Sequence, residues 1–357
     1  MKDFLIVGLG LAGISFAEVL RTEGKTFDVI SDDSYNSSVV AGAMYNPVVL
    51  KRYSEVWKSQ EQLQTAIPFY QNIQARLGVH FLHPMPLYRK FASIEEQNNW
   101  FVAADKPSLS PFLSTQIAKI DNPSLNLPFD CGQVLHSGFF NTNLFKASYT
   151  QDLISKNVFL NQHFNYEALT ISDSHIEYQG KTYKKIVFAD GYGLTNNPFF
   201  NNLPLDGTKG ELLVIKAPNL KIDFIIKSAV FIMPIGNDMY KVGATYNWTD
   251  KTDAITPEGK EELVNGLKQL INCDFEIVEH LAGIRPTVKD RRPLVGQHFK
   301  HQNMHVLNGL GTRGVMLGPF LATALYHAIF NQISLDKEIN INRIYKKLDI
   351  RIQHKNA

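Results

Sequence analysis

Two glycine-rich turns with the same spacing lie at opposite ends of the sequence. The first, "GLGLAG", spans residues 8–13, and the second, "GLGTRG", spans residues 309–314. Glycines at this spacing let the backbone approach the phosphates of a dinucleotide, and a helix that starts there adds a partial positive charge. The pattern therefore predicts dinucleotide chemistry, and it raises the question of why one chain carries the pattern twice.

Each glycine of the first turn has a separate expected role. Gly8 makes the tight turn, Gly10 lets the backbone approach a pyrophosphate, and Gly13 lets a helix and a strand pack closely. The amides of Leu11 and Ala12 belong to the helix start that faces the phosphates. An alternative is a glycine-rich loop without a ligand.

A strand, a helix and a second strand surround this turn. The apolar run "DFLIV" precedes the glycines, the helical segment "ISFAEVLRTEG" follows them and ends at Gly24, and "KTFDVIS" reads as the second strand. A residue at the end of such a second strand holds the ribose of the cofactor. Ser31, eighteen residues after Gly13, and Asp32 next to it are the candidates. The alternative is a solvated turn, "SDDS".

The rest of the chain predicts a mixed α/β protein. Residues 54–78 predict a helix that ends at Gly78 and that Pro68 kinks or splits, whereas residues 105–130 read as irregular chain. Helices are also expected over 141–157 and 257–270. Residues 210–247 predict an antiparallel sheet, and strand, glycine turn and long helix return near the end.

The composition of the chain excludes several classes of protein. The chain has 357 residues, which suggests two domains, and its net charge of +2 is too small to indicate nucleic-acid binding by bulk electrostatics. Only Cys131 and Cys273 are present, so a disulfide framework is not expected. No signal peptide, membrane-spanning run or metal-ligand cluster is visible. We expect a cytoplasmic protein without a bound metal.

Four motifs, in order, resemble the D-amino-acid oxidase superfamily of FAD-dependent oxidoreductases. They are "VGLGLAG", "IVFADGYG" at 186–193, "GIRPTVKDRRPLVGQ" at 283–297 and "GLGTRGVMLGP" at 309–319. Glycine oxidase is a related family. "AGAMYNP", "VGATYNW" and "GLGTRG" further resemble the oxidoreductase half of the bifunctional enzymes of tRNA 5-methylaminomethyl-2-thiouridine biosynthesis. The methyltransferase half of those enzymes has no counterpart in the sequence, so a tRNA substrate stays open.

The resemblance implies a Rossmann-like FAD-binding domain interleaved with a smaller domain built on an antiparallel sheet. The FAD-binding domain would comprise residues 1–50, 140–205 and 283–357, and the substrate domain residues 51–139 and 206–282. Neither cysteine lies in the motifs that attach flavin covalently in related families, so FAD is expected to bind noncovalently.

The resemblance also assigns the second glycine turn to the flavin ring rather than to the phosphates. Amides at the start of the last helix, with the helix dipole, would stabilise the negative charge of a reduced flavin. Further cofactor contacts are expected from the small residues of "SSVVAGAMYNPVV", from "IVFADGYG" and from the second turn: Ser38, Ala41, Gly42, Ala43, Met44, Ala189, Gly191, Gly309, Gly311, Thr312, Arg313, Gly314 and Val315. Arg313 is alternatively a solvated cation.

Arg285 is the expected carboxylate ligand, because it matches the position of the substrate-binding arginine in glycine oxidase and its planar guanidinium pairs with both carboxylate oxygens. A structural salt bridge is the alternative. Tyr246 is a second candidate for a substrate contact, with a core position as its alternative. Arg291 and Arg292 are weaker candidates.

The predicted activity is FAD-dependent oxidation of the C–N bond of an amine that carries a carboxylate. One substrate is the carboxymethylaminomethyl group of a tRNA wobble uridine, where the basic tail at Arg343, Lys346, Lys347, Arg351 and Lys355 would meet phosphates. A solvated helix face is the alternative for that tail. Free glycine, sarcosine or a D-amino acid is the second substrate class, and a noncatalytic flavoprotein is the third hypothesis.

Overall fold

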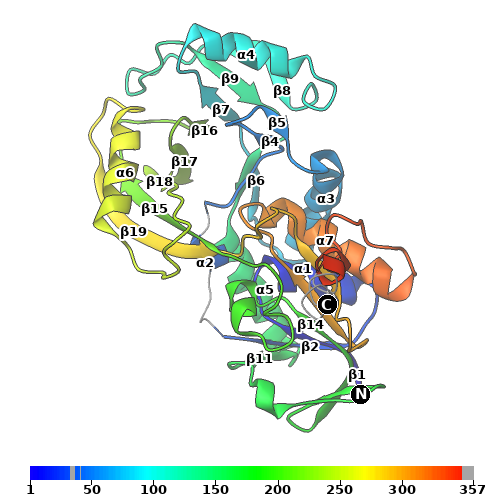
Figure 1. Ribbon diagram of the computed structural model, residues 1–357. Coiled ribbons are helices and arrows are strands. Elements are labelled where there is room, and N and C mark those ends of the chain that lie inside the picture. The colour runs from blue at the N-terminus through cyan, green and yellow to red at the C-terminus, as the bar shows by residue number, and fades with distance from the viewer. Residues whose placement is uncertain (33–36, 41, 348–357) are drawn as a thin grey trace.

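The computed structural model describes residues 1–32, 37–40 and 42–347, and two large sheets organise it (Figure 1). The core of the first sheet is parallel, in the order β11-β2-β1-β14-β21. These strands are β11 (Phe159–Asn161), β2 (Phe27–Ser31), β1 (Lys2–Val7), β14 (Lys181–Phe188) and β21 (Met304–Asn308). β1 and β14 end in runs of buried apolar residues, as strands covered on both faces do.

Three antiparallel strands extend this sheet. β13 (Ile176–Tyr178) pairs with the start of β14 and with β12 (Leu169–Ile171), and β20 (Leu294–Gln297) pairs with β21. Two short 3₁₀ helices, η1 (Tyr166–Ala168) and η2 (Gly191–Asn196), lie in its connections.

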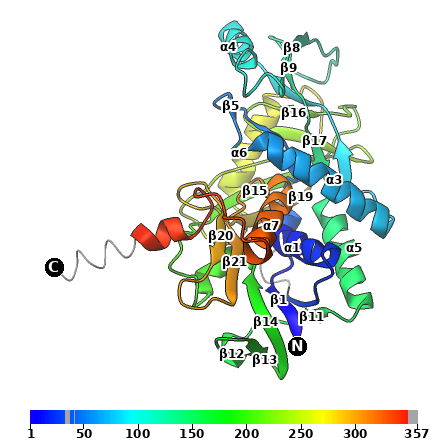
Figure 2. The same ribbon diagram turned by 90° about the vertical axis from the view of Figure 1, so that its right-hand side faces the viewer.

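Three helices pack on the same sheet, and a fourth packs on two of those helices, on the side toward the second sheet (Figures 1 and 2). They are α1 (Leu11–Thr22), α3 (Ser59–Leu77), α5 (Thr142–Ser155) and α7 (Gly314–Phe330). The buried carboxylate of Glu18 on α1 binds Arg76 of α3 at 2.9 Å and accepts a hydrogen bond from the Tyr149 hydroxyl of α5 at 3.0 Å. This polar contact fixes three helices relative to one another.

The second sheet has the order β19-β15-β18-β17-β16-β7-β9-β8 and is antiparallel except where β16 meets β7. Its strands are β19 (Glu276–Arg285), β15 (Thr208–Lys216), β18 (Met239–Gly243), β17 (Phe231–Gly236), β16 (Ile225–Lys227), β7 (Leu87–Lys90), β9 (Cys131–Val134) and β8 (Leu113–Ala118). Helix α6 (Pro257–Lys268) packs Leu263 and Leu267 into the apolar cluster on one face of this sheet. The opposite face carries the site described below.

Small elements join the two sheets. β10 (Gly138–Phe140) pairs with β3 (Met44–Tyr45) and β6 (Leu82–Pro84), and β4 (Val48–Val49) pairs with β5 (Ser54–Glu55). The short helix α2 (Ser37–Val40) contacts β19, and α4 (Ile94–Ala104) packs on β8 and β9. No described helix is both long and apolar enough to cross a membrane.

The fold class expected from the sequence is confirmed, and three local predictions change. The helix predicted from residue 54 begins at Ser59, after β5, and continues through Pro68 to a left-handed Gly78. Residues 105–130 were predicted to be irregular because of their prolines, but the structure has strand β8 there. The prolines lie on either side of the strand and leave it intact. Helix α4, capped by the Ser93 side chain, was not predicted.

The division into two domains stays a prediction. β19 extends to Arg285 and belongs to the second sheet throughout its length, so the boundary placed at residue 283 falls inside a strand.

The contact between α1 and α7 depends on glycine, and this generates a stability prediction. A Cβ at Gly318 would stand 2.7 Å from the Ser15 hydroxyl oxygen and 3.2 Å from the Leu11 carbonyl oxygen. We expect Gly318→Val to lower the free energy of unfolding by about 1–3 kcal/mol, because the helices must separate. Denaturant unfolding of the flavin-loaded protein measures it.

Ala324→Val on the partly exposed face of α7 is the matched control, since its cost is limited to helix propensity, below ~0.7 kcal/mol. Equal losses in the two variants would show that the α1–α7 contact tolerates a side chain.

Candidate active site and cofactor cradle

The first glycine turn follows β1 and opens α1. Gly8 adopts φ +99°, and a Cβ there would collide with the Ala189 carbonyl at the end of β14. A Cβ at Gly13 would collide with the Gly8 carbonyl oxygen, so helix and strand touch at this point. Gly10 is the N-cap of α1 and provides no side-chain cap. Uncapped amides at the start of a twelve-residue helix fit a pyrophosphate.

The two candidates for the ribose contact already have protein partners. The Ser31 hydroxyl accepts a hydrogen bond from the Leu9 amide at 3.2 Å, which ties the end of β2 to the glycine turn. The Asp32 carboxylate lies 2.7 Å from Nδ1 of the exposed His163. Their roles toward a ribose stay predictions.

The second glycine turn lies beside the first. Gly309 and Gly311 adopt φ +74° and +55°, and α7 begins at Gly314. A Cβ at Gly314 would stand 2.8 Å from Cδ1 of Leu11 in the first turn. Leu11, the first residue of α1, therefore packs against the start of α7. The structure brings together the two glycine turns, which are far apart in the sequence. Both turns present the N-terminus of a helix there.

Hydrogen bonds connect the second turn to the "ADG" motif after β14. The Asn308 amide donates to the Asp190 carboxylate and to the Gly191 carbonyl oxygen, each at 3.0 Å. The Asn308 side-chain oxygen accepts from the Gly309 amide at 2.7 Å. Burial raises the pKa of Asp190 to about 6, although Asn197 and Asn308 donate to it. Ala189 and Gly191 were predicted here, whereas the roles of Asp190 and Asn308 were missed.

The small-residue segment before β3 presses against the second sheet. A Cβ at Gly42 would stand 2.6 Å from the Phe231 ring, and Ala43 adopts φ +55°. Met44 is partly buried in β3. Ala41 lies outside the described residues, and the side chain of Ser38 is not described. Gly42 therefore lets the backbone before β3 lie against the Phe231 ring of β17, and the contacts of this segment with FAD stay predictions.

Arg313 joins that segment to the second turn. Its guanidinium donates to the Asn46 carbonyl oxygen at 2.8 Å. Burial lowers its pKa to about 10, so it stays cationic at neutral pH, and Tyr246 acts in the opposite direction. Thr312 next to it is exposed, and Val315 is buried in the core. Arg313 is thus a positioned group rather than the solvated cation of the alternative reading.

Arg285 is the last residue of β19, and its guanidinium lies over Gly210 of β15, the neighbouring strand in the sheet. A Cβ at Gly210 would collide with the guanidinium atoms, so this glycine makes the space in which Arg285 lies. Nη1 donates to the carbonyl oxygens of Lys209 and Thr245 at 3.3 Å each. No acidic side chain of the described residues forms an ion pair with Arg285. Burial lowers its pKa.

Tyr246 covers Arg285. The guanidinium carbon lies 4.4 Å from the centroid of the Tyr246 ring, and this tyrosine is 60% exposed. The core position that was its alternative is therefore wrong. Tyr246 raises the pKa of both Arg285 and Arg313, against the larger effect of burial.

A third cation was missed in the sequence. Lys227 faces its cross-strand neighbour Phe231, with Nζ 5.7 Å from the ring centroid. Burial, followed by the charges of Arg89 and Arg313, lowers the pKa of Lys227 to about 8. No sequence signal separates it from a surface lysine, because its burial depends on strands far apart in the chain.

The weaker candidates lie elsewhere. Arg292 binds Glu338 at 2.6 Å, and Arg291 is exposed in a left-handed turn. In the basic tail, Arg343 binds Asp290 and donates to carbonyl oxygens, whereas Arg351 and Lys355 lie outside the described residues.

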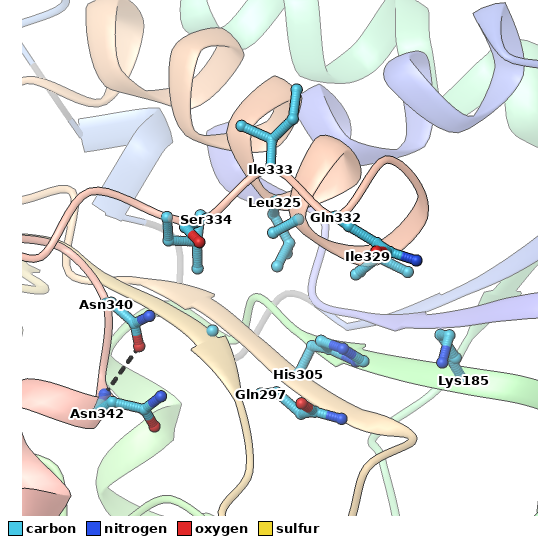
Figure 3. Close-up of a pocket in the computed structure, with 13 residues that line it drawn as sticks. Lys185, Gln297, His305, Leu325, Ile329, Gln332, Ile333, Ser334, Asn340 and Asn342 are labelled. Carbon is cyan, nitrogen blue, oxygen red and sulfur yellow. Dashed lines mark hydrogen bonds between the residues drawn. The ribbon is translucent and has the colours of Figure 1, made fainter.

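A cavity of about 400 Å³ lies at the far end of α7 and contains none of the predicted site residues (Figure 3). Lys185 and His305 on the strands face Leu325 and Ile329 of the helix. Burial lowers the pKa of His305 to about 3.

His305 therefore links stability to pH. Folding lowers the pKa of His305, so the neutral imidazole favours the folded state. This contribution to the free energy of unfolding is complete above the pKa of the unfolded chain, near 6.5, and is lost as pH falls toward 3. Between pH 7.5 and 5 the loss amounts to about 2 kcal/mol. We expect His305→Gln to flatten the dependence of unfolding free energy on pH by that amount. Parallel curves for the two proteins would contradict this.

Gly8 tests the cradle directly. We expect Gly8→Ala to abolish bound flavin absorbance in the purified protein, because the new methyl group displaces the turn from β14. Gly24→Ala is the matched control, since Gly24 also has positive φ but opens onto free space. Equal flavin content in both variants would count against the turn as the phosphate site.

Comparison with known proteins agrees with this geometry. The profile of the DAO family, described as FAD dependent oxidoreductase, matches residues 3–327. A tRNA 5-methylaminomethyl-2-thiouridine biosynthesis bifunctional protein from Marinobacter nauticus is 24% identical over 96% of this chain and 58% of its own length. The chain thus spans little more than half of that relative.

Two solved structures share the fold. Glycine oxidase from Geobacillus kaustophilus has a TM-score of 0.75 at 17% identity, covering 93% of this chain and 95% of its own. Iminodiacetate oxidase from Chelativorans sp. BNC1 has a TM-score of 0.75 at 16% identity, covering 94% and 98%. The resemblance seen in the four sequence motifs is confirmed: the chain belongs to the DAO family of FAD-dependent oxidoreductases, and FAD is its cofactor.

Proposed function

We propose that the protein oxidises the C–N bond of a secondary amine that carries an N-carboxymethyl group. The oxidation removes a hydride from the carbon between nitrogen and carboxylate and a proton from nitrogen. Water hydrolyses the resulting imine to glyoxylate and a primary amine. FAD, when bound, accepts the two electrons.

The observation that carries this proposal is the environment of Arg285. Its guanidinium is partly buried and is held between Gly210 and the Tyr246 ring, and its hydrogen-bond partners among the described residues are backbone carbonyl oxygens at 3.3 Å. A desolvated cation without a counter-ion is costly, and a substrate carboxylate removes that cost by a bidentate pair. A purely structural flavin needs no such group, so the noncatalytic hypothesis is disfavoured.

The other two cations prepare the amine. Oxidation needs the neutral amine, whose lone pair assists the loss of hydride. Arg285, Arg313 and Lys227 create a positive potential that lowers the pKa of a substrate ammonium group. Their charges thereby favour the reactive form without a dedicated general base.

Two substrate classes are candidates, and both are amines that bear a carboxylate on the carbon next to nitrogen. Likeness over nearly the whole chain to a protein of tRNA 5-methylaminomethyl-2-thiouridine biosynthesis favours a carboxymethylaminomethyl group on a tRNA wobble uridine. The fold shared with glycine oxidase supports free glycine, sarcosine or a D-amino acid as the second candidate.

Anaerobic reduction of the bound flavin by a panel of amines separates these substrate classes. Bleaching by tRNA or nucleoside that contains 5-carboxymethylaminomethyluridine, and not by free amino acids, is the expected result. Bleaching by glycine, sarcosine or D-alanine alone would assign the second candidate. A flavin that no amine reduces would end the proposal.

Arg285→Ala is expected to raise KM by about 100-fold, because a charge-assisted pair worth about 2–3 kcal/mol is lost. The flavin spectrum should stay unchanged, since Arg285 is not part of the phosphate cradle. Arg285→Lys, which keeps the charge without the fork, should fall between the two proteins. An unchanged KM in Arg285→Ala would remove this residue from the site.

A further inference from the structure

The cavity at the C-terminal end of α7 is separate from the candidate active site (Figure 3). Leu325 and Ile329 of α7 line it, eleven and fifteen residues after Gly314. At about 1.5 Å of rise per residue, they stand about 16–22 Å along the helix from the second glycine turn. The glycine turns, Arg285 and Tyr246 are not among the residues that line it.

The face of the first sheet that α7 covers changes from apolar to polar at this cavity. Val187, His305 and Gln297 lie in one row across the paired strands β14, β21 and β20. Lys185 stands two residues before Val187 in β14, so its side chain shares their face. Val187 belongs to the apolar cluster under α7, whereas the other three line the cavity. The strands therefore bring polar groups to a place where the helix still offers apolar side chains.

Lys185 is the one residue charged at neutral pH among the described residues that line the cavity. It is half-buried, burial lowers its pKa, and its ammonium group forms no ion pair or hydrogen bond within the described part of the chain. Nearby amide side chains already have partners. Gln297 donates to the Gln302 carbonyl oxygen at 2.6 Å, and the Asn340 side-chain oxygen accepts from the Asn342 amide at 2.9 Å. A partly desolvated cation without a counter-ion is costly, and an anion bound beside it removes that cost.

The opposite wall of the cavity is apolar. It is formed by side chains of α7 and of the segment that follows the helix: Leu325, Ala328, Ile329, Ile333 and Leu335. Water against such a wall finds few hydrogen-bond partners, so an apolar group gains by displacing it. The volume of about 400 Å³ suits a small organic molecule. The two walls together favour a ligand with one charged end and an apolar body.

We propose that this cavity binds a small carboxylate with an apolar chain, its carboxylate on Lys185 and its chain along Leu325 and Ile329. A single ammonium group matches a singly charged carboxylate better than a phosphate group, which carries more charge. The His305 ring also lines the cavity, but it is uncharged at neutral pH, because burial and then the charge of Lys185 lower its pKa to about 3. Lys185 therefore selects the anion, and the site does not depend on the amine oxidation proposed above.

Hexanoate, acetate and 1-hexanol test this pairing by calorimetric titration of the FAD-loaded protein. The titrations use Arg285→Ala as the background, which removes the expected carboxylate ligand of the candidate active site. Hexanoate should bind at least about tenfold more tightly than acetate, which lacks the chain, and than hexanol, which lacks the charge. If hexanoate does not bind, the cavity holds only solvent and the proposal fails. Acetate or hexanol binding as tightly as hexanoate would also overturn it.

Lys185→Gln in the same background should weaken hexanoate binding at least about tenfold, because a charge-assisted contact is lost. Lys184→Gln is the matched control, since this exposed neighbour points to the opposite face and binds Asp3 at 2.8 Å. Equal affinity in the two variants would place hexanoate elsewhere. Loss of an unpaired cation should leave the unfolding midpoint of unliganded Lys185→Gln at or above that of its parent, which checks that the variant folds.

Ala328→Phe tests the cavity by its volume, because the added ring enters from α7 and leaves Lys185 in place. It should keep its flavin and lose hexanoate binding. The imidazole NMR signal of His305, assigned by its absence in His305→Gln, should shift when hexanoate is added to the parent protein and stay fixed in Ala328→Phe. Hexanoate that binds without moving this signal occupies another site, and that result overturns the proposal.

Discussion

The close contact of the first turns of α1 and α7 is the constraint on which the site depends. Glycines at 314 and 318 let the backbone of α7 approach Leu11 and Ser15 without intervening side chains. As a result the N-termini of two helices meet at one edge of the first sheet. We therefore propose that one cofactor is contacted at its diphosphate by the first turn and at its redox end by the second, which would account for the repeated spacing.

The charged side chains around this contact are of two kinds, those paired with an opposite charge and those that are not. Within the strands and helices around the first sheet, charges are paired inside the protein, as Glu18 of α1 is with Arg76 and Asp28 of β2 with Lys2. At the candidate site, the partners of Arg285, Arg313 and Lys227 within the described part of the chain are backbone carbonyl oxygens or aromatic rings rather than carboxylates. Unpaired cations weaken the isolated protein, and anionic ligands that neutralise them add to its stability when they bind.

Much of the fold could be predicted from the sequence, but only a few residues of the candidate site. Glycine spacing and apolar runs predicted β1, α1, β2 and the start of α7, because these depend on local backbone geometry. Arg285 was proposed from its family position, and its surroundings were not predicted: Gly210 lies in another strand, and the exposure of Tyr246 depends on how the chain leaves β18. Lys227 was missed for the same reason. Pairing between distant strands leaves no local signal, so such neighbours emerge only from the folded chain.

The order of strands in the first sheet has a consequence for biosynthesis. β1 lies between β2 and β14, and β14 also pairs with β21, so the sheet is complete only after residue 308. Closure of such long loops is slow, and parallel strands wait with open edges until their neighbours arrive. On the ribosome, the cofactor cradle is therefore assembled among the last parts of the molecule, and a nascent chain that stops before α7 has only half of it.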